Sequence, residues 1–236
     1  MNRFFFVDKL PDLNAGNWEP PVELSRHIRA LRLKAGAELT LLPHFGDGVT
    51  AQLMENGQLL IKNSISRPVL ELPDISLATA WPKGNRGDEL VRRATELGAN
   101  RIVPISCQRS VFGRNDISRN KFDRWHKITK EVCQQCRRPN LPIIDSDVQN
   151  INQLPHLFGD HQLILLKPNA PLLANVINGI NKALLLVIGP EGGLTTSEED
   201  YLLEHGALAA GIGPTILRTE AAGPTAVAIA SHALSL

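Results

Sequence analysis

The stretch ALLLVIGPEGG (183–193), with TSEEDYLLEHG (196–206) and GIGPTILRTEAAGPTAVAIASH (211–232) after it, decides how this chain folds. The apolar run 183–188 has the length and composition of a buried parallel strand, and it stops at a glycine-rich loop, 189–193. A second run, 207–212, stops at Gly213-Pro214. Ligands in open α/β sheets bind at the carboxyl ends of strands, where glycine lets the backbone approach them. We therefore place the candidate site in these two loops.

The loop 189–193 is not typical of a phosphate site. Glycine amides at a helix entry bind anions. However, the Lys-Ser/Thr of a Walker loop is missing, no strand is followed by Gly-x-Gly-x-x-Gly, and Glu191 would repel a phosphate. A tight loop around an uncharged or cationic cofactor fits better, and a purely structural turn is the alternative.

Arg218-Thr219-Glu220 lies between the second run and the last expected helix. A guanidinium and a carboxylate two residues apart can orient a planar base or handle a proton. The alternative is an ion pair at a helix N-cap.

The composition, with 43% hydrophobic and 5% aromatic residues, favours an α/β protein over an all-β one. Residues 3–70 predict short strands at 3–7, 37–42, 50–55 and 58–65, a helix at 27–33 and an Asn-Gly hairpin at Asn56-Gly57. This spacing favours a small β-barrel or sandwich, so we expect one domain over 1–72 and a second over 73–236.

From residue 75 strands and helices alternate. Strands are expected at 75–81, 101–105, 141–144 and 162–166, and helices at 88–96, 120–138 and 222–234. Asp88 is the expected cap of the first helix, and Gly98 its stop. Thr195 with Glu198, or Thr196 with Glu199, forms a capping box for the helix that Gly206 ends; the pattern leaves the register open.

The charge is unevenly distributed. The formal net charge is only +1, yet residues 82–140 carry +8 and residues 141–236 carry −6. Such a local excess attracts polyanions. Arg124, Lys127 and Lys130 recur at helical spacing and form one basic stripe, which suits nucleic-acid phosphates; a solvated helix face is the alternative.

Three cysteines, an odd number, favour a reducing cytoplasm. Cys133-x-x-Cys136 falls inside an expected helix, and no second Cys/His pair has zinc spacing, so no metal site is expected. No apolar run approaches the roughly 18 residues of a membrane span, so no membrane association is expected.

Motifs along nearly the whole chain resemble the ribosomal RNA small subunit methyltransferase E family of the SPOUT superfamily. They are HIRALRLK (27–34) with Gly36, ATELG (94–98), RIVPI (101–105), QRS (108–110), Lys121 with Arg124-Trp125, Gln135 with Arg138, IGPEGG (188–193) and ILRTEA (216–221). The last two together are highly specific for this family. Two positions depart from its usual pattern, namely Thr215 in place of Arg and Ala221 in place of Thr.

The resemblance implies an α/β protein with a PUA-like RNA-binding β-barrel over 1–72 and a SPOUT methyltransferase domain over 73–236. It also implies a C-terminal trefoil knot, a homodimer and S-adenosylmethionine as cofactor. The residues implied for the cofactor are Leu166, Gly189, Pro190, Glu191, Gly192, Gly193, Ile212, Gly213, Ile216, Leu217 and Arg218.

The implied reaction is methylation of N3 of one uridine near the decoding centre of 16S rRNA, on the assembled small subunit. Arg218 and Glu220 are the expected catalytic residues. The expected RNA contacts are Arg3, Arg29, Arg32, Arg93, Arg109, Arg124 and Lys127. The competing interpretations are a non-catalytic RNA-binding ribosome assembly factor and a methyltransferase acting on tRNA.

Overall fold

The structure, a computed structural model, describes residues 3–14, 16–82, 84–110 and 117–235. The chain divides into two compact units. The first contains 1–70 together with 133–141, and the second contains 71–132 and 142–236. The segment 133–141 lies outside the range that the sequence assigned to the first domain.

The first unit is built on a mixed five-stranded sheet with the order β1-β3-β4-β5-β2. Its strands are β1 (Arg3–Phe6), β2 (Asn17–Trp18), β3 (Glu38–Leu42), β4 (Gly48–Leu53) and β5 (Leu59–Ile65). Strand β1 runs parallel to β3, and the other pairs are antiparallel. Phe5, Leu39, Leu41 and Leu59 form the core of this unit. The predicted β4–β5 hairpin is confirmed, with Gly57 at φ 85° in its loop.

The helix of this unit begins earlier than the sequence predicted. Helix α1 spans Val22–Ala30, not 27–33, and follows Pro21 directly. Leu24 and Ile28, four residues apart, are its buried side chains. Arg32 has φ 52°, a left-handed conformation that no helix continues through, so the periodic residues after Ala30 are outside the helix.

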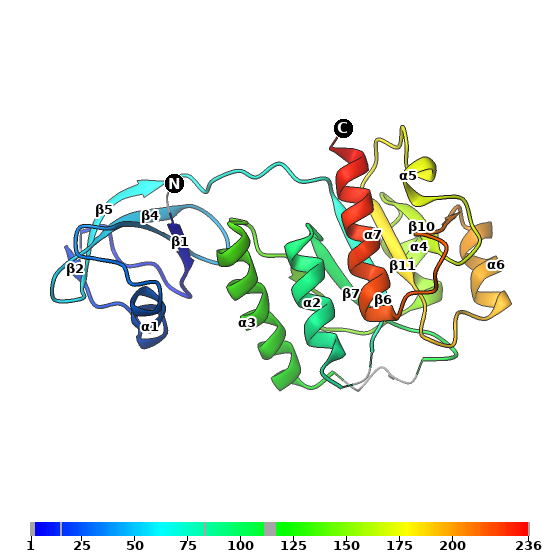
Figure 1. Cartoon of the computed structure of the whole chain (residues 1–236), viewed down its shortest axis with the longest axis horizontal. Coiled ribbons are helices and arrows are strands. Elements are labelled where there is room, and N and C mark those ends of the chain that lie inside the picture. Colours follow the sequence, from blue (N-terminus) through cyan, green and yellow to red (C-terminus); the bar gives the residue numbers. More distant parts are fainter. Residues whose placement is uncertain (1–2, 15, 83, 111–116, 236) are drawn as a thin grey trace. The chain divides into compact units, whose positions relative to one another are not determined.

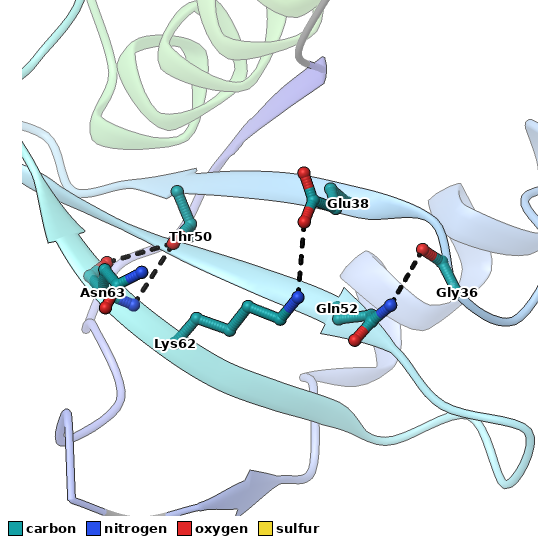
Figure 2. A network of polar contacts seen from close by, with 6 residues as sticks. All are labelled: Gly36, Glu38, Thr50, Gln52, Lys62 and Asn63. Carbon is teal, nitrogen blue, oxygen red and sulfur yellow. Dashed lines mark hydrogen bonds and ion pairs between the residues drawn. The ribbon is translucent and has the colours of Figure 1, made fainter.

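One face of this sheet is polar (Figure 2). Lys62 of β5 reaches across β4 to Glu38 of β3, with Nζ and Oε1 3.3 Å apart. The β4–β5 register shifts between Val49 and Ala51. At this irregularity the Thr50 hydroxyl accepts a hydrogen bond from the Asn63 amide at 3.2 Å and donates one to the Asn63 carbonyl at 3.3 Å. A side chain therefore satisfies the backbone groups that the ladder leaves unpaired.

Arg67 connects separate pieces of the first unit. Its Nε donates to the Gly46 carbonyl at 2.8 Å, its Nη2 donates to the Pro43 carbonyl at 2.6 Å, and its Nη1 donates to the Pro139 carbonyl. Burial lowers the pKa of this guanidinium, and the nearby Asp47 opposes that shift. The segment 133–141 is thus held to the sheet loops by a charged hydrogen-bond donor.

Substituting Arg67→Leu is expected to lower the free energy of unfolding of the first unit by about 2 kcal/mol, since three carbonyls lose a charged donor. Urea titration with hydrogen exchange of the β4 and β5 amides measures this. Lys62→Leu is the matched control, because an exposed ion pair contributes at most about 1 kcal/mol. Equal effects of the two substitutions would contradict the expectation.

The second unit is built on a seven-stranded parallel sheet with the order β12-β10-β11-β6-β7-β8, in which β9 also pairs with β7. The strands are β6 (Ile75–Ala80), β7 (Arg101–Ser106), β8 (Ile143–Ile144), β9 (Gln149–Asn150), β10 (Gln162–Leu166), β11 (Leu184–Ile188) and β12 (Leu208–Ala210). Strands β6 and β11 are buried along their whole length, as expected of central parallel strands.

Helices cover both faces of this sheet. On one face lie α2 (Arg86–Glu96), α3 (Arg119–Cys136), α5 (Leu173–Val176) and α7 (Thr219–Leu234), and Figure 1 shows α7 running across the central strands. On the other lie the 3₁₀ turn η1 (Ile151–Gln153), α4 (Leu154–Leu157) and α6 (Thr196–Glu204). Within β11, Leu184 and Leu186 face the first layer and Leu185 faces the second.

The first residues of α2 and α7 differ from those predicted, and the start of α6 decides between the two capping boxes that the sequence allowed. Helix α2 begins at Arg86, and Asp88 does not cap it. The Asp88 carboxylate instead accepts a hydrogen bond from Trp125 Nε1 at 3.0 Å, a tertiary partner that outcompetes the local one. Helix α7 begins at Thr219, three residues before the predicted start. For α6, the register that the sequence left open is the box of Thr195 with Glu198. Gly98 and Gly206, both at positive φ, follow α2 and α6 as predicted.

Candidate functional site

A pocket of about 500 Å³ lies at the carboxyl ends of β10, β11 and β12 in the second unit. Three loops form it, one following each strand. All the residues that the sequence assigned to a cofactor line this pocket, together with Leu165, Lys167, Pro168, Ile188, Leu194, Glu199, Thr215, Thr219 and Ala222. Segments more than 50 residues apart in the sequence therefore meet in one cavity.

Glycine is required where these loops pass close to other atoms. A Cβ on Gly189 would stand 3.0 Å from Cγ of Leu194, and one on Gly211 would stand 2.8 Å from the Ala170 carbonyl oxygen. Gly193 has φ 71°, and its amide donates to the Pro190 carbonyl at 2.8 Å, which closes the turn. The tight backbone loop predicted from the sequence is present.

Two charged side chains fasten the loop after β11 to the end of β7. Arg109 Nη1 donates to the carbonyls of Gly192 and Leu194 at 2.9 and 3.2 Å. The Glu198 side chain, in a residue only 4% exposed, accepts hydrogen bonds from the Gln108 amide at 2.7 Å and the Thr195 amide at 2.9 Å. Arg109, which the sequence assigned to RNA, thus contacts the wall of the pocket.

Arg218 and Glu220 stand at the start of α7. Arg218 is the exposed N-cap residue and lines the pocket. Glu220 pairs with Arg86, whose Nη1 is 3.7 Å from Glu220 Oε1. Its second oxygen, Oε2, is buried and has no hydrogen-bond partner among the residues that the structure describes. Arg218 is thus at the N-cap, as the alternative interpretation expected, but the described residues show Glu220 paired with Arg86 and not with Arg218.

Sequence reasoning missed two charged residues of the site. Arg86 lies 3.5 Å from Glu191 as well as near Glu220, and Lys167 pairs with Glu199, so both cations contact residues far along the chain. The basic loop around Arg86 was visible in the sequence. Its partners were not, because no local spacing links residues more than 100 positions apart.

The residues assigned to RNA differ in how far they are already engaged. Arg93 pairs with Glu89 at 2.8 Å and with Glu96 at 3.3 Å, and the bond to Glu89 raises the pKa of Arg93. Arg124 pairs with Asp88 at 2.6 Å. The remaining four are exposed and have no ion-pair partner within the described part of the chain: Arg3, Arg29, Arg32 and Lys127.

The cysteines are free thiols. Burial raises the pKa of Cys107 and of Cys133 to about 12, whereas Cys136 is exposed. Among the described residues, no group of three or more His, Cys, Asp or Glu side chains is arranged to hold a metal ion. Within the same residues, no helix is long and apolar enough to cross a membrane.

Alkylation with iodoacetamide at pH 8 is expected to modify Cys136 first, since thiols with a pKa near 12 stay protonated at that pH and the thiolate is the nucleophile. Peptide mass spectrometry over a time course measures this, with the urea-unfolded chain as control. Equal labelling of all three cysteines in the native protein would contradict it.

The amino-acid sequence of this chain is similar to those of known RNA methyltransferases. The profile of a family described as RNA methyltransferase domain matches residues 70–231. Ribosomal RNA small subunit methyltransferase E of Bacillus subtilis is 29% identical over 232 residues, which cover 91% of this chain and 89% of the relative. The protein of the same name from Synechocystis is 31% identical and is covered over 67% of its length.

The fold of this chain is also similar to that of a solved structure. It is a putative methyltransferase from Legionella pneumophila in complex with the bound cofactor SAM, with a TM-score of 0.79 and 25% identity. The match covers 99% of this chain and 98% of that one. The similarity therefore extends over both units.

Proposed function

The chain belongs to the ribosomal RNA small subunit methyltransferase E family, and from that premise we propose that it methylates N3 of a uridine in 16S rRNA with S-adenosylmethionine as donor. The proposed target lies near the decoding centre of an assembled small subunit in the cytoplasm. The observation that carries the proposal is the pocket at the carboxyl ends of β10, β11 and β12, which gathers all the residues expected to bind the cofactor.

The pocket residues fit this cofactor. A volume of about 500 Å³ is within the range of small-molecule sites. Leu166, Ile212 and Leu217 offer apolar surface to a nucleoside, and glycine-rich backbone surrounds it. The carboxylate of Glu191 suits a cation and not a phosphate. When bound, the cofactor supplies an electrophilic methyl group on a positively charged sulfur.

The protein must make N3 of uracil nucleophilic, since this nitrogen carries a proton. We assign removal of that proton to Glu220, whose buried Oε2 lacks a donor within the described chain. We assign to Arg218, exposed at the pocket, stabilisation of the negative charge that develops on a uracil carbonyl oxygen. Holding the base beside the methyl group supplies the rest of the catalysis.

The first unit is proposed to bind RNA as a PUA-like domain over 1–72, with 73–236 as the catalytic domain. Support comes from the exposed guanidinium groups of Arg3, Arg29 and Arg32, which can contact phosphates. A homodimer and a C-terminal trefoil knot are further parts of the proposal. Ile216 and Leu217, which line the pocket and are 85% and 36% exposed, offer apolar surface that a second copy of the chain could cover. Light scattering of the purified protein measures the oligomeric state.

The test is methyl transfer from labelled S-adenosylmethionine to unmodified small subunits, free 16S rRNA and tRNA, followed by nucleoside analysis. N3-methyluridine from the small subunits alone is the expected result. Product from tRNA would favour the tRNA enzyme. No product and no cofactor binding would leave a non-catalytic RNA-binding assembly factor.

A further inference from the structure

A single guanidinium joins the two carboxylates nearest the proposed reaction. Arg86 is the first residue of α2, and its Nη1 lies 3.5 Å from Glu191 Oε1 and 3.7 Å from Glu220 Oε1. Glu191 belongs to the loop that lines the pocket, and Glu220 to the first turn of α7. Arg86 therefore links the cofactor loop to the helix that carries the proposed base.

The two oxygens of Glu220 have different surroundings. The side chain is only 15% exposed, with Oε1 facing Arg86. Oε2 is buried, and no group of the described residues donates to it. Leaving a buried acceptor unpaired is unfavourable, and such a group calls for a functional explanation. An N–H group of a bound substrate would satisfy this oxygen.

We propose that Arg86 is a positioning residue for the methyl transfer. It holds Glu220 through Oε1, so that Oε2 is the oxygen left to accept the N3 proton of uracil. Glu191 is its second anchor and keeps the guanidinium beside α7. This inference rests on the proposed function, and it adds a residue that no sequence motif assigned to the site.

Within the described part of the chain, few charged side chains lie on the elements around Glu220. The elements packed against α7 are α2, α5, β6 and β11, and the last three carry no titratable side chain. On α2, Arg93 pairs with Glu89 and Glu96, and Asp88 pairs with Arg124. Arg86 is, among the described residues, the cation in an ion pair with Glu220, whereas Arg92 of α2 forms no ion pair there. Glu191 lies beside Arg86, and Arg218 is two positions before Glu220 in the chain.

Arg86→Met is expected to lower kcat about tenfold, with the cofactor Kd and the KM for small subunits changed less than about threefold. Arg86→Lys, which keeps the charge, should retain a kcat within about threefold of the wild type, and this rescue separates holding of the carboxylate from a merely structural role. An unchanged kcat would overturn the proposal. An unchanged kcat with a raised KM would also indicate that Arg86 contacts RNA.

Arg101→Met is the matched control. It removes an ion-paired guanidinium, bound to Asp145 at 2.7 Å, from the amino end of β7, whereas the pocket lies at the carboxyl ends of the parallel strands. Adding Arg86→Met to Glu220→Gln should cause little further loss of kcat, since both substitutions act through one carboxylate. Additive losses of kcat would overturn the proposal.

The wild-type protein is assayed first. Absence of N3-methyluridine in that assay refutes the proposed function and is not confused with a failure of the Arg86 inference. If Arg86→Met unfolds, Arg86→Gln takes its place, and a kcat within about threefold of the wild type in that folded variant overturns the proposal.

Discussion

Substituting Glu220→Gln is expected to lower the rate of the proposed methyl transfer to small subunits by about 100-fold or more, the usual contribution of a positioned general base. Glutamine keeps the shape of the side chain but has no carboxylate to take the proton from N3 of the proposed uridine substrate. The cofactor Kd should stay within about twofold, since Glu220 does not line the pocket. Single-turnover rates with labelled cofactor, together with calorimetric titration of the cofactor, give both quantities.

The matched control for this substitution is Glu204→Gln at the exposed end of α6, which removes a carboxylate that forms no ion pair within the described structure. Its rate should equal that of the wild type. Thermal unfolding of both variants separates a loss of chemistry from a loss of fold. A wild-type rate for Glu220→Gln would remove the base role and leave Glu220 as a partner of Arg86 alone.

Glu198→Ala is the substitution with the largest expected effect on stability, a loss of about 3 kcal/mol in the free energy of unfolding. The carboxylate accepts from two backbone amides and from the Thr195 hydroxyl at 3.0 Å, in a residue 4% exposed. Truncation leaves these donors unpaired and removes the capping box of α6. Urea unfolding should show a lower midpoint with an unchanged slope.

Glu198→Gln keeps an acceptor oxygen and should lose roughly half as much. Glu204→Ala controls for removing an exposed glutamate from the same helix and should lie within about 0.5 kcal/mol of wild type. If Glu198→Ala also lies within that range, water must replace the carboxylate, and the link between the loop and β7 would contribute little.

The glycine-rich loops made the pocket predictable. Apolar runs that stop at Gly189 and Gly213 mark strand ends, and parallel strands bring those ends to one edge of the sheet. The capping box at Thr195 was readable for the same reason, since all its partners lie within three residues. Both features depend on residues that are close together in the chain, so their spacing in the sequence is enough to predict them.

The errors arose where a distant partner competes with a local one. Asp88 is a good N-cap by type, but Trp125, 37 residues away, takes its carboxylate. The basic loop containing Arg86 was visible, yet its role depends on Glu191 and Glu220. Nothing in one sequence fixes such pairings, because they follow from how α2 and α7 pack together.

The segment 133–141 belongs to the first unit although it lies more than 60 residues after the rest of that unit in the sequence. The polypeptide passes between the two units three times, after residues 70, 132 and 141. A fragment that ends near residue 72 would therefore lack part of its own structure, including the Pro139 carbonyl that Arg67 holds. The first unit is therefore discontinuous in sequence, and the two units cannot be separated by a single cut. Exchanging either unit between relatives requires cutting within α3 as well as after residue 70.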